Sequence, residues 1–196
     1  MQVAIVKYNA GNIYSVECAL RRAGVTPILT DDKEILMSAD KVIFPGVGEA
    51  ATTMAYLREH GLDCLIRDLK QPVLGICIGM QLMCRHSEEG NVDCLGIFDV
   101  DVKRFCPETR EQKVPHMGWN TLNKVDTHMF PAEVEGKYVY FVHSYYVPVS
   151  SYTTATTDYI HPFSAALQRN NFYAIQFHME KSGVVGESIL HHFLSL

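Results

Sequence analysis

The chain has 196 residues, 47% of them hydrophobic and 20% charged, and its net charge at pH 7 is −5. This composition indicates a globular protein with a sizeable core, because a chain of this length buries roughly 70% of its unfolded surface. The acidic balance excludes a basic face for nucleic acid or for an anionic membrane surface. We therefore expect no nucleic-acid or membrane partner, and a small molecule or another protein instead.

The six cysteines form no CxxC pair and show no tight, even spacing. This usage argues against a disulfide framework and against a zinc site, and it indicates a reducing compartment. The first residues, MQVAIVKYNAGN, lack the apolar run and cleavage site of a secretory signal. The longest apolar stretch, Val73 to Cys84, is well short of the roughly 18 residues that a membrane span needs. We expect a cytoplasmic protein.

The first 90 residues alternate between short β-rich runs and amphipathic segments, which is typical of βαβ units on a parallel sheet. One helix is predicted from Asn12 to Arg22 and stopped by Gly24, and a longer helical stretch from Glu49 to Leu69 is interrupted near Gly61. The predicted strands are Val3–Val6, Pro27–Thr30, Lys41–Phe44 and Pro72–Ile76.

From Gly96 onward the hydrophobic period changes to two, which predicts largely antiparallel strands. These strands are expected in IFDVDVKRF, WNTLNKV, KYVYFVH, YYVPV and SAALQRN. A last helix is predicted over Gly183–Leu194, with Ser182 placed to cap it. The expected fold is α/β, a single compact domain over residues 1–196 with a mostly parallel, flavodoxin-like central sheet flanked by helices and added antiparallel strands in the C-terminal half.

The segment PVLGICIGMQL places an apolar strand before Cys77 and a helix-compatible stretch after it. A nucleophile on such a sharp turn needs very small neighbours two residues away, and Gly75 and Gly79 meet that need. A helix N-terminus also favours the thiolate. The alternative is a buried structural thiol, because free cysteine is among the most buried residue types.

A cysteine nucleophile needs a base, and His178 in AIQFHMEKS ends an apolar strand. In an extended segment Glu180 points to the same side and can orient the imidazole, although such a pair can also be a solvated surface pair. The turn in IFPGVGEA, at Val47 and Gly48, presents backbone N–H groups at the carboxyl edge of the sheet. With the N–H of Ile78 it forms a candidate oxyanion hole, or else a plain strand-to-helix loop.

In this order and over this span, PGVG, GICIGMQL and QFHMEKS resemble the triad glutamine amidotransferases, whose glutaminase domains hydrolyse glutamine and pass ammonia to a synthase. More closely, PHMGWN, YFVHSYY, SEEG and the early pair Gly11-Asn12 are similar to the family of glutaminase subunits of imidazole glycerol phosphate synthase, an enzyme of histidine biosynthesis. The resemblance spans essentially the whole chain, and PHMGWN is its most specific element.

The resemblance implies that Cys77 attacks the glutamine amide carbon to form a thioester, that His178 moves the protons and that Glu180 orients His178. It also implies an oxyanion site at Val47, Gly48 and Ile78, and no cofactor or metal. The residues that it implies for binding the substrate glutamine are Gln81, Glu89, Ser144 and Tyr145. In such a family we expect weak glutaminase activity for the isolated chain, because the bulky Val47 stands in the oxyanion turn and ammonia release is coupled to ammonia use.

The resemblance further implies a partner, a (β/α)8-barrel cyclase subunit that uses the ammonia. Asn12, Trp119 and Lys181 lie in segments that face this partner in the family, although they also fit a loop polar residue, a core aromatic and a surface charge. The chain departs from the family at Met179, where a proline is usual, and at KYNAGN, which is less glycine-rich. The geometry of His178 relative to Glu180 is thereby left open.

Three alternatives remain from the sequence. The first is the glutaminase of another synthase, against which PHMGWN argues. The second is a stand-alone cysteine hydrolase, in which the acidic residue typically lies on an earlier strand end. The third, from a different class, is a non-catalytic flavodoxin-like binding module with Cys77 in its core. That module predicts a phosphate-binding loop after the first strand, and KYNAGNIYS matches it poorly.

Overall fold

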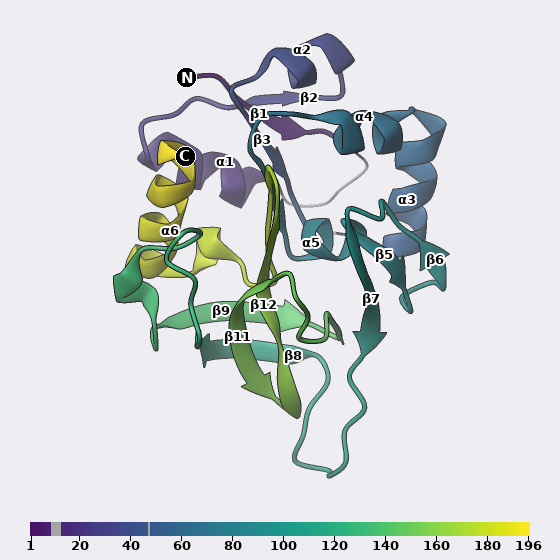
Figure 1. Cartoon of the computed structure of the whole chain (residues 1–196), viewed down its shortest axis with the longest axis vertical. Coiled ribbons are helices and arrows are strands. Elements are labelled where there is room, and N and C mark those ends of the chain that lie inside the picture. Colours follow the sequence, from purple (N-terminus) through teal and green to yellow (C-terminus); the bar gives the residue numbers. More distant parts are fainter. Residues whose placement is uncertain (9–12, 47) are drawn as a thin grey trace.

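A seven-stranded sheet runs through the middle of the molecule in the computed structural model, which describes residues 1–8, 13–46 and 48–196 (Figure 1). The strand order is β11-β12-β13-β4-β3-β1-β2. The five strands from β13 to β2 pair in parallel, and β12 and β11 add an antiparallel hairpin at one edge. The strands are β1 (Val3–Val6), β2 (Ile28–Thr30), β3 (Lys41–Phe44), β4 (Val73–Ile76), β11 (Thr153–Tyr159), β12 (His161–Arg169) and β13 (Phe172–Ile175).

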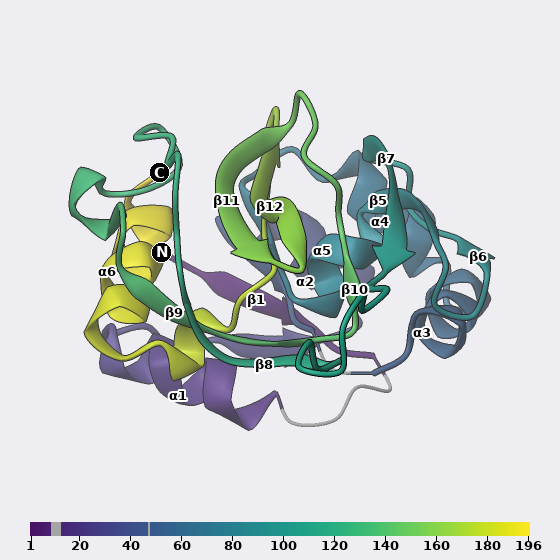
Figure 2. The same cartoon turned by 90° about the horizontal axis from the view of Figure 1, so that it is seen from below.

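Both faces of this sheet are covered by helices, because its parallel strands are apolar on both sides. Within β1, for example, Ala4 and Val6 join one hydrophobic core and Val3 and Ile5 join the other. The helices divide between the two cores and hence between the two sides of the sheet, as Figures 1 and 2 also show. One side carries α1 (Tyr14–Arg22) and α6 (Gly183–Ser195), and the other carries α2 (Lys33–Ser38), α3 (Ala50–Glu59), α4 (Leu62–Asp68) and α5 (Ile78–Leu82).

Two smaller sheets flank the central one. A four-stranded sheet has the order β10-β7-β5-β6, and β8 pairs antiparallel with β9 across the end of the molecule that lies opposite α2 (Figure 1). Two 3₁₀ turns complete the elements, η1 (Ala132–Val134) and η2 (Met179–Lys181). The strands are β5 (Cys84–Ser87), β6 (Val92–Asp93), β7 (Phe98–Arg104), β8 (His116–Thr121), β9 (Tyr138–His143) and β10 (Tyr145–Tyr146).

The expected architecture, a mostly parallel sheet flanked by helices with added antiparallel strands, is confirmed. Each of the first four predicted strands lies within one residue of its observed bounds. The long helical stretch is divided where expected, because Gly61 adopts φ 62° between α3 and α4. Gly24, with φ 80°, follows the end of α1. The predictions for Gly11, Asn12 and Val47 concern positions outside the described residues.

Several sequence predictions were incomplete or wrong. The sequence did not predict α2, which is only six residues long although the Asp32 carboxylate accepts hydrogen bonds at its N-terminus. It also missed β5, β6 and the threonine-rich β11, which lack a clear apolar alternation. The Ser182 side chain does not cap α6. Its hydroxyl donates to the His178 carbonyl at 2.6 Å and accepts from the Tyr140 N–H at 3.0 Å, so it fastens the segment before the helix.

All six cysteines are unpaired thiols. Among the residues that the structure describes, no helix is long and apolar enough to cross a membrane.

Candidate active site

The candidate site lies at the carboxyl edge of the parallel sheet, where open α/β folds bind ligands. β3, β4 and β13 are neighbours in the sheet and end at Phe44, Ile76 and Ile175. The segments that leave these three strands carry the PGVG turn, Cys77 and His178. Parallel pairing therefore brings together three motifs that are far apart in the sequence.

Cys77 lies on a strained turn between β4 and α5, with φ 51° and ψ −108°. Such a conformation costs a non-glycine residue about 1–3 kcal/mol and needs close packing around it to persist. A Cβ atom on Gly79 would lie 2.2 Å from the carbonyl oxygen of Phe44, and one on Gly75 would lie 2.9 Å from the Gly79 carbonyl carbon. The expectation that both neighbours must be glycine is confirmed.

Besides the imidazole, two polar groups of the described residues lie near the Cys77 sulfur. The Val142 carbonyl oxygen is 3.9 Å from it, and the Gln176 side-chain Nε2 is 3.7 Å from it. Gln176 is fully buried, and its Oε1 accepts a hydrogen bond from Gln81 Nε2 at 2.9 Å. Because the oxygen of Gln176 is held by Gln81, its N–H groups face the sulfur. Gln176 was not predicted as a site residue, since only the three-dimensional fold brings it close to Cys77.

His178 and Glu180 form a buried pair beside Cys77. The imidazole Nδ1 is 2.7 Å from Glu180 Oε1, and the two side chains are 5% and 4% exposed. The i and i+2 positions meet through the turn η2, and the extended segment that the sequence suggested is absent here. Glu180 Oε2 has no hydrogen-bond partner among the described residues.

Two opposing effects act on the His178 imidazole. Burial disfavours its charged form, but the interactions with the Cys77 thiol and the Glu180 carboxylate are together stronger and raise the pKa of His178 to about 10. An imidazole in this environment holds a proton readily and is stabilised next to a thiolate. Because Nδ1 faces Glu180, Nε2 is the nitrogen available to Cys77 and to a substrate.

A cavity of about 360 Å³ opens at the Cys77 turn. It is large enough for an amino acid. Glu180 lies behind His178, outside the lining. The residues that line the cavity are Gly46, Gly48, Cys77, Ile78, Gln81, Glu89, Pro115, Val142, His143, Ser144, Tyr145, His178 and Lys181. Every described residue that was predicted from the sequence as the nucleophile, the base, part of the oxyanion site or a substrate-binding residue therefore lines this one cavity.

The candidate oxyanion segment lies directly against the Cys77 turn. A Cβ atom on Gly46 would lie 1.8 Å from the carbonyl oxygen of Ile76 and 2.7 Å from the Ile78 nitrogen. Only glycine permits this approach. Gly48, with φ 137°, also lines the cavity, while Val47 lies outside the described residues. The backbone that follows β3 thus stands close to the N–H of Ile78.

Glu89 reaches the cavity from a turn between β5 and β6. Its Oε2 accepts a hydrogen bond from the Ala50 N–H at 3.0 Å, at the start of α3. Burial raises the pKa of Glu89, the Ala50 N–H lowers it and the charge of Glu49 raises it, so that the net shift is upward. The carboxylate is half-buried, and the hydrogen bond from the Ala50 N–H holds it at the cavity.

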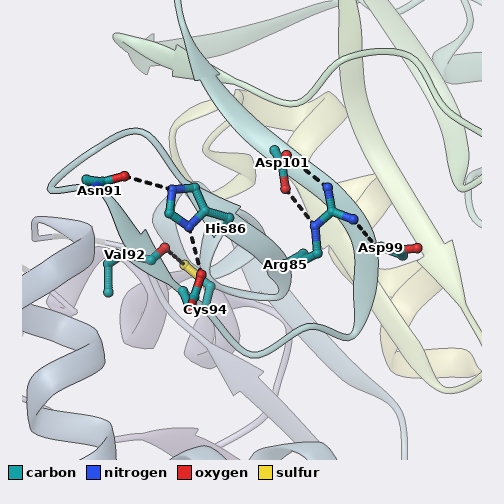
Figure 3. A network of polar contacts seen from close by, with 8 residues as sticks. Arg85, His86, Asn91, Val92, Cys94, Asp99 and Asp101 are labelled. Atoms are coloured by element: carbon teal, nitrogen blue, oxygen red, sulfur yellow. Dashed lines mark hydrogen bonds and ion pairs between the residues drawn. The ribbon is translucent and has the colours of Figure 1, made fainter.

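Charged side chains hold the strands on either side of this turn (Figure 3). The Arg85 guanidinium joins β5 to β7, with Nε 2.9 Å from Asp101 Oδ1 and Nη1 2.7 Å from Asp99 Oδ1. His86 Nδ1 is 2.8 Å from Asp93 Oδ1 in β6. These pairs are exposed, and each contributes little to the free energy of folding. The two hydrogen bonds between Arg85 and Asp101 nevertheless fix the orientation of the guanidinium. These pairs keep the turn that carries Glu89 in register.

His143 and His116 were missed as site residues, although they lie in the motifs YFVHSYY and PHMGWN. His143 lines the cavity and is buried, and its Nδ1 is 2.7 Å from the Tyr145 carbonyl oxygen. His116 Nδ1 is 3.0 Å from His143 Nε2. A sequence shows two histidines 27 positions apart, and nothing in their spacing indicates that they touch.

Trp119 is 56% exposed on β8, so its interpretation as a core aromatic is wrong. Its ring packs edge-on against Tyr140, with the ring centres 5.9 Å apart. Lys181 is exposed in η2 and also lines the cavity, so the cavity reaches the surface at this residue. Within the described ranges, no group of three or more His, Cys, Asp or Glu side chains is placed to hold a metal ion.

Comparisons with known proteins identify the family of the chain. The family model for "Glutamine amidotransferase class-I" matches residues 5–195. Imidazole glycerol phosphate synthase subunit HisH of Bacteroides thetaiotaomicron is 67% identical over 196 residues, covering 100% of both chains. The subunit of the same name from Escherichia coli K12 is 44% identical over 198 residues, again covering 100% of both.

Solved structures support the fold. A crystal structure of a glutamine amidotransferase superposes with a TM-score of 0.74 at 19% identity, covering 98% of this chain and 97% of that one. At that identity the likeness establishes the fold alone. The family match and the close full-length relatives establish more: this chain belongs to the class-I glutamine amidotransferases and, within them, to the family of imidazole glycerol phosphate synthase subunits HisH.

Proposed function

We propose that this chain, a glutamine amidotransferase of histidine biosynthesis, hydrolyses glutamine through Cys77, His178 and Glu180 and delivers the ammonia to a (β/α)8-barrel cyclase subunit. The single observation that carries the proposal is the placement of Cys77 on a strained turn, in the same cavity as His178, whose imidazole is hydrogen-bonded to the buried Glu180. Nucleophile, base and orienting acid are thus within one site.

In the first half of the reaction the Cys77 thiolate attacks the side-chain amide carbon of glutamine. The carbonyl oxygen takes the negative charge and is stabilised by the Ile78 N–H and by the backbone of the turn that contains Val47 and Gly48. His178 then gives its proton to the amide nitrogen, so that the C–N bond breaks and ammonia leaves. The product is a γ-glutamyl thioester on Cys77.

In the second half a water molecule attacks the thioester. His178 takes a proton from this water, a second oxyanion forms in the same site, and the C–S bond breaks to release glutamate and the Cys77 thiolate. Glu180 keeps its charge throughout and holds the imidazole by Nδ1. Its near-complete burial strengthens that interaction because water does not screen it.

Gln81, Glu89, Ser144 and Tyr145 bind the α-amino-acid end of glutamine in this proposal. Gln81 Nε2 donates to Gln176 Oε1 and to the Tyr145 carbonyl, at 2.9 and 3.0 Å. Both N–H groups are thereby used, and the Gln81 carbonyl oxygen is left to accept a hydrogen bond from an ammonium group in the cavity. The Glu89 carboxylate supplies negative charge for the same group.

The relatives named HisH are subunits of a synthase, so the chain acts with a partner subunit. We infer that this partner is the cyclase barrel and that it covers the end of the molecule formed by β8, β9 and η2. Exposed apolar side chains support this placement, namely Met117 and Trp119 on β8, Tyr14 on α1 and Val184 on α6. The cavity also reaches the surface here, at Lys181. Free cysteines fit the cytoplasm as the location.

Replacement of Cys77 by alanine tests the proposal. In the complex with the partner subunit, we expect Cys77→Ala to lower glutamate release from glutamine on the order of 10⁴-fold or more, because the thioester cannot form. Cys94→Ala, which removes a partly buried thiol outside the cavity, serves as the control and retains activity. Continued hydrolysis by the Cys77→Ala complex would refute the triad.

A further inference from the structure

A second polar network reaches the cavity at His143, and the chemistry above does not use its histidines. It runs from Asn120 through His116 and His143 to the carbonyl oxygen of Tyr145. The successive distances are 3.3 Å from Asn120 Nδ2 to His116 Nε2, 3.0 Å from His116 Nδ1 to His143 Nε2, and 2.7 Å from His143 Nδ1 to the Tyr145 oxygen.

The acceptor at one end of the network and the Asn120 donor at the other require the same position for each proton. A carbonyl oxygen only accepts hydrogen bonds, so His143 Nδ1 carries a hydrogen. Nε2 of the neutral ring then carries a lone pair and acts as an acceptor. His116 Nδ1 must therefore donate to it, which leaves His116 Nε2 to accept from Asn120 Nδ2. Asn120 Nδ2 also donates to the Asp158 carbonyl at 3.0 Å. Both histidines are neutral in this arrangement, and each has a defined tautomer.

Packing holds His116 in this orientation. The ring is stacked between Tyr159 and Phe141, with ring centres 4.0 and 4.9 Å away and interplanar angles of 15° and 23°. His116 and His143 are 4% and 5% exposed. A buried polar pair of this kind adds little net stability compared with an apolar pair of the same shape. We therefore look for its role in the orientation of the groups that it contacts.

The Tyr145 carbonyl is where this network meets the substrate site. It accepts from His143 and also from Gln81 Nε2 at 3.0 Å, and Gln81 lines the cavity. If His143 changed tautomer, its Nδ1 lone pair would face the carbonyl oxygen and repel it. The segment that carries Tyr145 would move, and Gln81 would lose one of its two fixed acceptors.

We propose that His116 is a positioning residue for glutamine binding: by donating to His143 it selects the His143 tautomer that holds the Tyr145 carbonyl, and with it Gln81, in place. The inference rests on the proposed function, since it assigns His116 to the same substrate site. His116 touches neither the nucleophile nor the cavity, and it acts through His143.

Two substitutions and one control separate positioning from packing. His116→Phe keeps an aromatic ring between Tyr159 and Phe141 but removes the donor. His116→Asn loses the ring stack but places an amide N–H near the position of Nδ1. The control is His161→Phe, because His161 belongs to the same aromatic cluster, with its ring centre 5.5 Å from Phe105, and takes no part in the network.

Glutamine affinity is measured by calorimetry in a Cys77→Ser background, with the chain assembled with its partner subunit so that binding is seen without turnover. We expect His116→Phe to raise the Kd for glutamine about tenfold, the effect of one misaligned buried hydrogen bond. His116→Asn recovers most of the affinity and His161→Phe leaves it unchanged. In chains that retain Cys77, the His116→Phe change appears in KM with kcat largely kept.

The tautomer itself is read by ¹⁵N NMR of the imidazole rings in the full-length chain. We expect His143 in the parent chain to carry its proton on Nδ1 and His116→Phe to introduce the other tautomer. An unchanged Kd or an unchanged His143 tautomer in His116→Phe would overturn the inference, as would equal weakening by the phenylalanine and asparagine variants. If no chain binds or hydrolyses glutamine, the proposed function fails, and the NMR result still decides whether His116 sets the tautomer.

Discussion

Gly79 shows most directly how single residues make the candidate nucleophile possible. The Cys77 turn is strained, and it persists because α5 starts almost in contact with the end of β3. At the closest point a Cβ atom on residue 79 would stand 2.2 Å from the Phe44 carbonyl oxygen, which belongs to the backbone and has little room to move. The absence of a side chain at this position is therefore a structural requirement of the site.

We expect Gly79→Ala to destabilise the protein by about 3 kcal/mol or more, because the new methyl group must push β3 and α5 apart. Gly24→Ala is the matched control, since a Cβ atom there meets nothing within 4 Å and only the positive φ of 80° opposes it, at a cost of about 1–2 kcal/mol. Urea unfolding measures both variants. Equal losses in the two would show that the close contact at Gly79 is not the cause.

The residues of the site differ in how far the sequence alone predicts them. Cys77 and its two glycines can be predicted because the strand, the turn and the helix that define their role are contiguous in the sequence. His178 and Glu180 can be predicted as a pair for the same reason, since they are two positions apart. Gln176 and His116 cannot, because their partners lie 99 and 27 positions away and only the folded sheet brings them together.

At the scale of elements, the parallel strands were predicted well because each is buried on both faces and reads as a short apolar run. The elements that were missed follow other rules. β11 is rich in threonine, and its hydroxyl groups find partners such as the Thr121 carbonyl, so burial leaves no apolar signal. α2 is too short for a helical period and is recognisable only by its Asp32 cap.

The pairing of β8 with β9 buries two histidines, and this makes stability depend on pH. Burial lowers the pKa of His116 to about 4. Burial also lowers the pKa of His143 to about 3; the Tyr145 carbonyl opposes this shift, and the charges of His116 and His178 reinforce it. In the unfolded chain both rings titrate near 6.5. Between about pH 6.5 and pH 4 the unfolded state therefore binds protons that the folded state does not.

Because the unfolded state binds more protons in this window, the free energy of unfolding must fall as the pH drops from about 6.5 towards 4, by up to about 1.4 kcal/mol per pH unit for each histidine. His116→Phe removes one of the two, so we expect a shallower slope in the variant than in the parent. Guanidinium unfolding at a series of pH values gives both slopes. Parallel curves would mean that His116 is not buried as a neutral ring.

At the scale of the whole molecule, the cavity and the exposed apolar residues share one end. η2 contacts α1, α6 and β9, and it carries Lys181, where the cavity reaches the surface. In Figure 2, α1 and β8 both lie towards the lower side of the molecule. Scattered apolar residues are common on any surface, but these four lie on β8, the partner strand of β9, and on α1 and α6, and the elements β9, α1 and α6 all contact η2. Such a group is suited to a partner.

Trp119 has the largest side chain of the four exposed apolar residues, and aromatic side chains of this kind dominate binding energies. We expect Trp119→Ala to raise the Kd for the partner subunit about 30-fold, which corresponds to about 2 kcal/mol. Met37→Ala is the control, because Met37 is a similarly exposed apolar residue, 63% against 56%, on α2 at the opposite end of the molecule. Surface plasmon resonance with the immobilised partner measures both. If Met37→Ala weakened binding as much as Trp119→Ala, or if neither did, the partner would have to bind elsewhere. The cavity would then open at Lys181 to solvent instead of to the subunit that uses the ammonia.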